Sequence, residues 1–324
     1  QYARFARDFG GADFMSWAVN DFHLTEANWQ NINRVSAMLN EPGRFIVFPG
    51  YEWSATTSRG GDHNVIFKTE GMPLLRSGYA EHDLRGYDPM TDRYTVPELL
   101  SSLDPEHTIV MPHIGGRRAD LAYYDPEFMY FVEMYSSHGQ FEWFLKEALE
   151  RELFSGFVAS SDDAWGKLGD SPAGASGLFA VHGGVTCVYA EALNRDSLWK
   201  AFKEKRVYGT TGERIQLRFR AGRHWSGETI SSDGPVTFSV EASGTQPIEK
   251  IEIHRNADLV HAFDVTGGRS ARKLKIIWRG ASSRERARQS LWAGSVSLSR
   301  GNIVSVEPFR IDQPNERTQL IGSQ

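Results

Sequence analysis

The order of apolar and amphipathic stretches constrains the fold of this chain more than any other feature. Up to about Gly212, short apolar runs typical of buried strands alternate with longer stretches of helical periodicity. The strand-like runs are DFMSWAV, RFIVFPG, HNVIF, TIVMPHI, FMYFVEMY, SGFVASSD and GVTCVYA. The helix-like stretches are TEANWQNINRVSAMLN, TVPELLSSLD, QFEWFLKEALERELF and NRDSLWKAFKEKRVYG. This alternation predicts βα units and a largely parallel sheet or barrel.

Two of the helix-like stretches begin with residues that favour a helix N-terminus. Thr25 is followed by Glu26, and Asn194 is followed by Asp196. Thr and Asn side chains accept hydrogen bonds from the N–H groups of the first turn, and an acid there interacts favourably with the helix dipole. We therefore expect Thr25 and Asn194 to cap helices.

The pattern of apolar and polar residues changes after Gly212. From Glu213 to the end, short runs with period-2 alternation are separated by Gly, Asn and Asp, and the RNADLV segment resembles a hairpin connection. The runs are IQLRFRAG, GPVTFSVEASG, IEKIEIHRNADLVHAF, KLKIIWRG, SLWAGSVSLSRG and NIVSVEPF. We therefore predict two domains, an α/β domain over residues 1–212 and a small all-β sandwich over 213–324.

Composition excludes several classes of partner. The formal net charge is −5 and the pI is near 6.1, so the chain lacks the basic footprint of a nucleic-acid-binding protein. The longest apolar runs are far shorter than the roughly 20 residues that cross a bilayer, which argues against a membrane partner. Cys187 is the only cysteine, so no intrachain disulfide forms. The appended sandwich favours an exported protein, and the missing initiator Met suggests that an upstream segment was trimmed.

Histidines and acids gather where the predicted strands end. The residues concerned are Asp21, His23, Glu52, His113, Glu133, His138, Asp162, Asp163 and His182, with His63 at the start of another apolar run. In parallel α/β barrels the C-terminal ends of the strands carry the site. His, Asp and Glu are ligands of divalent metals, and a metal would stabilise a buried carboxylate beside a neutral imidazole. The pattern predicts a metal site that includes Glu52, His63, His113 and Asp162.

Taken singly, these side chains have simpler explanations as caps or ion-pair partners. Glu52 could pair with Arg44 or Arg59, and Glu133 could pair with Arg117 or Arg118. His63 could bond a backbone carbonyl. Only the joint occurrence at one end of the strands favours a metal.

A series of motifs in the first domain resembles the PHP (polymerase and histidinol phosphatase) superfamily. The motifs are DFMSWAVNDFH, PGYEWS, GGDHNVIF, MPHIGG, VEMYSSHGQFEW, GFVASSDDAWGKLG, HGGVTCVYAEAL and KRVYGTTGERI. The resemblance covers essentially the whole first domain and is to a mostly uncharacterised group in which a sandwich follows the barrel. It implies a distorted (β/α)7 barrel, up to three divalent metals at its C-terminal face, and phosphoester hydrolysis.

The superfamily's ligand positions match this sequence only in part. Glu52 corresponds to the bridging Glu, His63 to the next metal-binding His, His113 to the His of the SHPG-like segment, and Asp162 to the Asp of the closing Asp-x-His. The opening His-x-His has no counterpart, because the chain starts after that point.

Two further positions depart from the superfamily pattern. Phe22 replaces the His of Thr-Asp-His, and Ala164 replaces the His of the closing motif. In the superfamily both serve the third metal, so we expect one or two divalent ions (Zn, Mn or Fe). Asp21, His23 and His182 remain candidate ligands.

The chemistry implied is a metal-dependent hydrolase. Asp163 or His138 could move the proton, and Arg117, with its neighbour Arg118, could clamp an anionic group. Aromatic residues near the loops could line a pocket for a sugar, so the expected substrate is a small, saccharide-like anion. The alternatives are a barrel that has lost catalysis and binds a ligand or acts as a scaffold, and a hydrolase of another ester or an amide.

Overall fold

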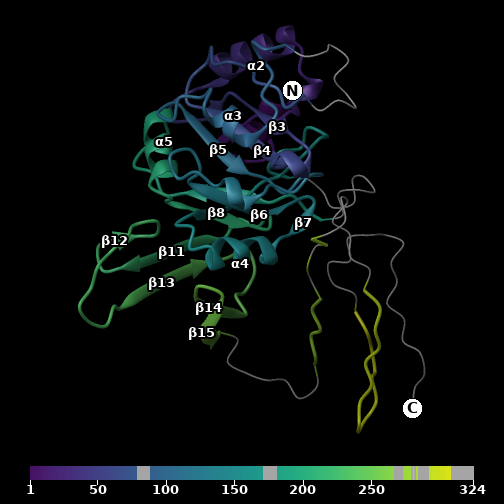
Figure 1. The fold of residues 1–324 in the computed structure, drawn as a ribbon. Helices are drawn as coiled ribbons and strands as arrows, with labels where there is room; N and C mark the ends of the chain where they lie inside the picture. Colours follow the sequence, from purple (N-terminus) through teal and green to yellow (C-terminus); the bar gives the residue numbers. More distant parts are fainter. Residues whose placement is uncertain are drawn as a thin grey trace.

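The computed structural model describes residues 1–78, 88–170, 181–265, 273–278, 280, 282–283 and 292–307. These residues form a mixed α/β structure (Figure 1), with more strands than helices. The helices are α1 (Tyr2–Asp8), α2 (Glu26–Leu39), α3 (Val96–Leu100), α4 (Glu142–Glu150) and α5 (Arg195–Lys203), and the 3-10 turns are η1 (Asp21–His23), η2 (Thr57–Arg59) and η3 (Leu121–Tyr123). No helix within the described ranges has the length and apolar character that a membrane crossing requires.

Ten strands belong to the first predicted domain. They are β1 (Phe14–Ser16), β2 (Ile46–Phe48), β3 (Gly50–Ser54), β4 (Asp62–Phe67), β5 (Thr108–Pro112), β6 (Phe131–Ser136), β7 (Gly139–Gln140), β8 (Gly156–Ala159), β9 (Val185–Val188) and β10 (Val207–Thr210). They form separate small sheets in the orders β1-β2, β3-β4-β5, β7-β6-β8 and β10-β9. β5 lies beside β6, and β8 lies beside β10. No closed barrel exists among the described strands.

The expectation of a largely parallel sheet was only partly right. β1 pairs with β2 in parallel and β6 with β8 in parallel, but β3, β4 and β5 are antiparallel, as are β9 and β10. The reason for β3 and β4 is the length of their connection. Only residues 55–61 join them, whereas a parallel crossover needs about a dozen residues or more.

Besides the cluster that packs α1 and the end of α2 against β1 and β2, three apolar clusters hold the helices onto these strands. One joins α2 and α3 to β3 and β4 through Trp29, Tyr51, Phe67 and Leu99. A second packs Trp199 and Phe202 of α5 against strands β2, β5, β6 and β8. A third packs Phe141 and Phe144, at the start of α4, against β6. The core is therefore built before residue 212, as the apolar runs indicate.

Both predicted helix caps are confirmed. The Thr25 side chain accepts a hydrogen bond from Asn28 N at 3.1 Å, and Asn194 Oδ1 accepts one from Ser197 N at 2.8 Å. The helix boundaries at these two points follow from local sequence alone.

The Asn194 cap gives a direct stability prediction. The Asn194→Ala variant is expected to lose about 1 kcal/mol of unfolding free energy in urea, because a first-turn N–H loses its acceptor. Asn194→Ser is the matched control, since serine also caps; an equal loss in both variants would contradict this role.

The C-terminal third shows only part of the predicted sandwich. β11 (Gln216–Ala221), β12 (His224–Trp225) and β13 (Phe238–Ser243) form an antiparallel sheet, and β14 (Lys250–Arg255) and β15 (Asp258–Asp264) form a hairpin. The predicted RNADLV hairpin is confirmed, with Asn256 at a φ of 55° in its turn. The later predicted strands are not formed in 273–278 and 292–307, and the rest of those segments lies outside the described residues. The division near Gly212 stays a prediction.

Candidate active site

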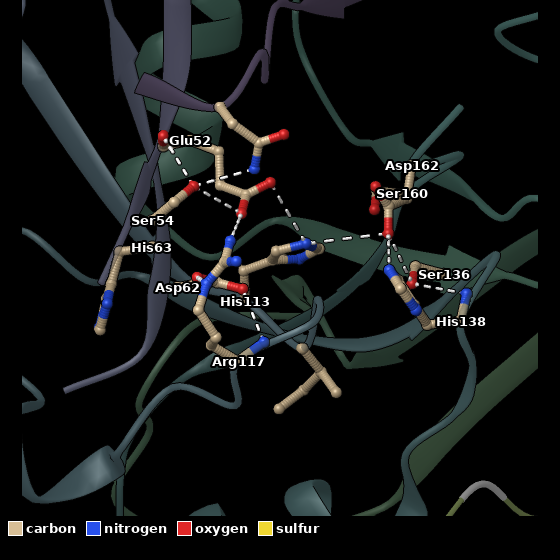
Figure 2. Close-up of polar contacts among 12 residues, drawn as sticks. Glu52, Ser54, Asp62, His63, His113, Arg117, Ser136, His138, Ser160 and Asp162 are labelled. Atoms are coloured by element: carbon tan, nitrogen blue, oxygen red, sulfur yellow. Dashed lines mark hydrogen bonds and ion pairs between the residues drawn. The ribbon is translucent and has the colours of Figure 1, made fainter. Parts of the chain in front are cut away.

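Strand register decides which of the predicted residues share a face. In the β3–β4 pair Glu52 lies opposite Asn64, and Trp53 lies opposite His63. Because cross-strand partners share a face and neighbours along a strand alternate, Glu52 and His63 lie on opposite faces. Figure 2 shows the His63 ring apart from the other labelled side chains. The prediction that Glu52, His63 and His113 hold one ion is therefore wrong for His63.

His63 is buried on the other face of the sheet. Its ring is fully buried, lies with its centroid 6.1 Å from that of Trp53, and has Nδ1 3.1 Å from Gly61 O. Burial lowers the pKa of His63 to about 4, so the ring is neutral. The simpler alternative, a histidine bonded to a backbone carbonyl, is the one the structure shows.

His113 is the centre of the candidate site. It follows β5 directly, and its Nδ1 lies 2.7 Å from Oε2 of Glu133 on β6. Its Nε2 lies 3.9 Å from Glu52 Oε2 and 3.8 Å from Asp162 Oδ2 (Figure 2). One ring nitrogen is thus bonded to a carboxylate, and the other faces two more.

His113 and Glu133 stabilise each other's charged form. Burial lowers the pKa of His113, but the Glu133 carboxylate outweighs it and raises that pKa well above the usual value. Burial raises the pKa of Glu133, but the His113 charge and hydrogen bonds from Ser160 and Ile114 N bring it below the usual value. In the metal-free protein the two therefore form a buried ion pair.

Asp162 and His138 form the second part of the cluster. Asp162 follows β8 with a φ of 45°, and its Oδ2 lies 3.2 Å from His138 Nε2 and 3.4 Å from the donating Ser136 Oγ. Burial raises the pKa of Asp162 to about 6. A positive φ is uncommon for residues other than glycine, and such backbone often occurs at functional sites. Asp162 and His138 thus lie where the strand-end pattern predicted.

Arg117 lies inside the cluster and not on the surface. Its Nε donates to Asp62 Oδ1 at 2.6 Å, its backbone N donates to Asp62 Oδ2 at 2.9 Å, and its Nη2 donates to Glu52 Oε1 at 3.2 Å. The residue is 9% exposed. The predicted role as a clamp for a substrate anion is not supported, since the guanidinium already binds two carboxylates.

Four other predicted residues have contacts outside this cluster. Asp21 accepts from the backbone N of Ser54 and of Ser77, and burial raises its pKa to about 6. His23 is exposed, with its ring centroid 4.5 Å from that of Phe22. Asp163 accepts from two backbone N–H groups of its own loop. His182 Nδ1 lies 3.1 Å from Gly183 O.

These contacts correct several predicted roles. Asp21 joins η1 to the backbone of Ser54 and Ser77, and Asp163 caps its own loop, so a role of Asp163 in proton transfer stays a prediction. The contact of the His23 ring with Phe22 and that of His182 Nδ1 with Gly183 O both lie outside the cluster around His113.

Sequence reasoning missed Asp62 and the partner of Glu133. Asp62 immediately precedes His63, and only the β3–β4 register shows that Asp62 and not His63 shares the face of Glu52. Glu133 was considered as a partner of Arg117 or Arg118, but its partner is His113. Glutamate inside the apolar run FMYFVEMY was the available signal, because a buried carboxylate requires a compensating partner.

Within the described ranges, no three His, Cys, Asp or Glu side chains are arranged as a ready-made metal site. The separations around His113 are nonetheless close to those of ligands of one ion. For metal–ligand bonds of about 2.1 Å in tetrahedral geometry, neighbouring ligand atoms lie about 3.4 Å apart. His113 Nε2 lies 3.9 Å from Glu52 Oε2 and 3.8 Å from Asp162 Oδ2, so these side chains must move inward to bind an ion.

Comparisons with curated proteins find relatives in Chlamydia. An uncharacterized protein of Chlamydia pneumoniae is 25% identical over 293 residues, which cover 80% of this chain and 45% of that protein. One of Chlamydia trachomatis is 27% identical over 300 residues, 82% of this chain and 46% of its own length. The chain therefore spans less than half the length of these relatives.

A weak likeness to a solved structure and a family match complete the comparisons. A two-domain protein from Bacteroides vulgatus, described as containing a predicted PHP-like metal-dependent phosphoesterase, has a TM-score of 0.38 and 12% identity, covering 77% of this chain and 83% of its own. At that score the likeness supports no conclusion about fold or activity. A family model described as "Protein of unknown function (DUF3604)" matches residues 7–81 and 148–247, more than half of the chain. The chain belongs to the DUF3604 family.

Proposed function

We propose that this protein is a metal-dependent hydrolase with a single divalent ion bound at His113, Asp162 and Glu52. The observation that carries the proposal is the orientation of the His113 ring, with Nδ1 bonded to one carboxylate and Nε2 facing two others. Metal-binding histidines usually donate their other ring N–H to a carboxylate, which fixes the tautomer and the ring orientation. Glu133 supplies that carboxylate, and Nε2 faces Glu52 and Asp162.

The charges of the cluster also favour a bound cation. Arg117 and a protonated His113 bring two positive charges, whereas the cluster contains four carboxylates, those of Glu52, Asp62, Glu133 and Asp162. Excess negative charge is costly in a buried environment. A divalent ion at His113 Nε2 would displace the ring proton and, together with Arg117, would offset most of this negative charge.

A bound divalent ion would lower the pKa of a coordinated water from 15.7 to about 7 and so supply a nucleophile at neutral pH. The residues of this chain would do the rest. Glu133 holds the His113 tautomer, and Ser136 orients the Asp162 carboxylate. His138, with its Nε2 at Asp162, is within reach to hold or move a proton, in place of Asp163.

The finer parts of the proposal concern fold, substrate and location. We infer that the fold is a distorted, open form of a (β/α)7 barrel. We infer that the substrate is a small phosphoester anion, with a saccharide-like part that would contact the aromatic residues near the loops. We also infer that the protein is exported. The sequence motifs that resemble the PHP superfamily support the reaction class. Zn, Mn and Fe remain candidate ions.

The test is metal dependence of both binding and hydrolysis. We expect the purified protein to bind a divalent ion, to hydrolyse a member of a phosphoester panel, and to lose that activity on chelation and regain it on reloading. His113→Gln is expected to lose the ion. His107→Gln is the control, because His107 is an exposed histidine paired with Asp104. A protein that binds no ion and hydrolyses nothing would overturn the proposal.

A second candidate is a barrel-derived module that binds a ligand without catalysis. The placement of His63 on the opposite face of the sheet from Glu52 favours it, since it removes one expected ligand. Saturable ligand binding without turnover, unchanged in Glu52→Ala, would support this function and count against hydrolysis. Turnover of an ester other than a phosphoester, or of an amide, would keep the metal site and change the substrate.

A further inference from the structure

We propose that Arg117 is a built-in cation that occupies the place of a second metal ion beside Glu52 and limits the site to one ion. This inference rests on the proposed function, because it concerns the number of ions that the same cluster accepts.

The contacts of Arg117 are those of a fixed internal counter-charge. Its guanidinium lies between Asp62 Oδ1 at 2.6 Å and Glu52 Oε1 at 3.2 Å, while its own backbone N holds the other oxygen of Asp62 (Figure 2). Asp62 is fully buried, and Glu52 is 7% exposed. Two buried carboxylates thus share one cation, and that cation is covalently part of the chain.

The surrounding donor atoms are those of a hard cation site. Asn64 pairs with Glu52 across the two strands, and Asp62 lies two residues before Asn64 on β4, so all three side chains share one face of the sheet. Asn64 is 6% exposed, and its Oδ1 has no hydrogen-bond donor among the described residues. Buried carbonyl oxygens normally have a partner, and carboxylate plus amide oxygens suit Mn²⁺ or Mg²⁺. Without the Arg117 guanidinium, the side-chain oxygens of Glu52, Asp62 and Asn64 would be able to bind a metal ion.

The two oxygens of Glu52 have different neighbours because Arg117 binds only one of them. Oε1 accepts from Arg117 and from Ser54 Oγ at 2.9 Å, and Oε2 faces His113 Nε2. Arg117 is therefore a positioning residue that orients Glu52 toward the proposed single ion. Its positive charge also neutralises the carboxylates that would otherwise attract a second ion.

Removal of the guanidinium charge is the test, with Mn²⁺ alone as the probe. Equilibrium dialysis followed by elemental analysis is expected to find one Mn²⁺ per wild-type chain and one more in Arg117→Gln. Arg117→Lys keeps the charge and is expected to match the wild type. Arg118→Gln removes the neighbouring arginine, which pairs with Glu147, and is also expected to match it. Asp62→Asn added to Arg117→Gln is expected to abolish the extra ion.

The outcomes separate this inference from the proposed function. Equal Mn²⁺ counts in the wild type and Arg117→Gln overturn the inference, whether the count is one or two. No ion in the wild type but one in Arg117→Gln supports the inference and refutes the proposed function, and no ion in either refutes both. If Arg117→Gln does not fold alone, it is refolded with excess Mn²⁺; recovery that needs Mn²⁺ supports the inference, and failure to recover overturns it.

Discussion

Replacement of Glu133 by glutamine is expected to weaken divalent-metal binding about 10- to 100-fold, the range found when a carboxylate behind a metal-binding histidine is changed. Glu133 does not face the proposed ion. It lies behind His113, where Oε2 is 2.7 Å from Nδ1 and also accepts from Ile114 N at 3.2 Å. A glutamine amide no longer fixes the Nδ1-protonated tautomer by charge, so Nε2 becomes a weaker ligand.

The measurement is competition for Mn²⁺ or Zn²⁺ against a chromophoric chelator. Glu127→Gln is the matched control, because Glu127 is exposed at a turn on the chain leading to β6 and the same charge is lost there. Unchanged affinity in Glu133→Gln would leave His113 as a structural ion-pair partner. An equal fall in both variants would show only an effect of net charge.

The parts of the structure that follow from local sequence were predicted well. The α2 and α5 start points depend on Thr25 and Asn194, whose side chains bond N–H groups three residues away. The hairpin at Asn256 depends on a turn of two residues. Glu52, His113 and Asp162 do lie close together, although Glu52 is in the middle of β3 and not at a strand end.

The parts that depend on pairing between distant segments could not be predicted. Asp62 and His63 are adjacent, and a shift of one residue in register exchanges which of them faces Glu52. The backbone N of Arg117 donates to the Asp62 carboxylate, and nothing in the local sequence indicates this contact. The face of the sheet that a side chain occupies and its ion-pair partner both depend on tertiary structure. Residue type alone therefore does not identify the ligands correctly.

Replacement of Trp199 by alanine is expected to cost about 3–5 kcal/mol of unfolding free energy, a large share of the roughly 5–15 kcal/mol that stabilises a typical domain. Trp199 lies on α5 and is 4% exposed. Its ring centroid is 5.9 Å from that of Phe48 on β2, and its Nε1 donates to Glu106 O at 3.0 Å. The truncation would leave a cavity in the cluster that joins α5 to β2, β5, β6 and β8, and an unsatisfied carbonyl beside it.

Urea unfolding of the metal-free protein measures this cost without a contribution from ion binding. Trp165→Ala is the matched control, because Trp165 is 60% exposed in the loop after Asp162, and its loss is expected to change the unfolding free energy by less than about 0.5 kcal/mol. The cluster around Trp199 packs against β5, β6 and β8. β5 precedes His113, β6 carries Glu133, and β8 precedes Asp162. Trp199→Ala is therefore also expected to lose its bound ion at a lower urea concentration than the wild type. Loss of the ion at the same urea concentration would mean that the site and this cluster unfold independently.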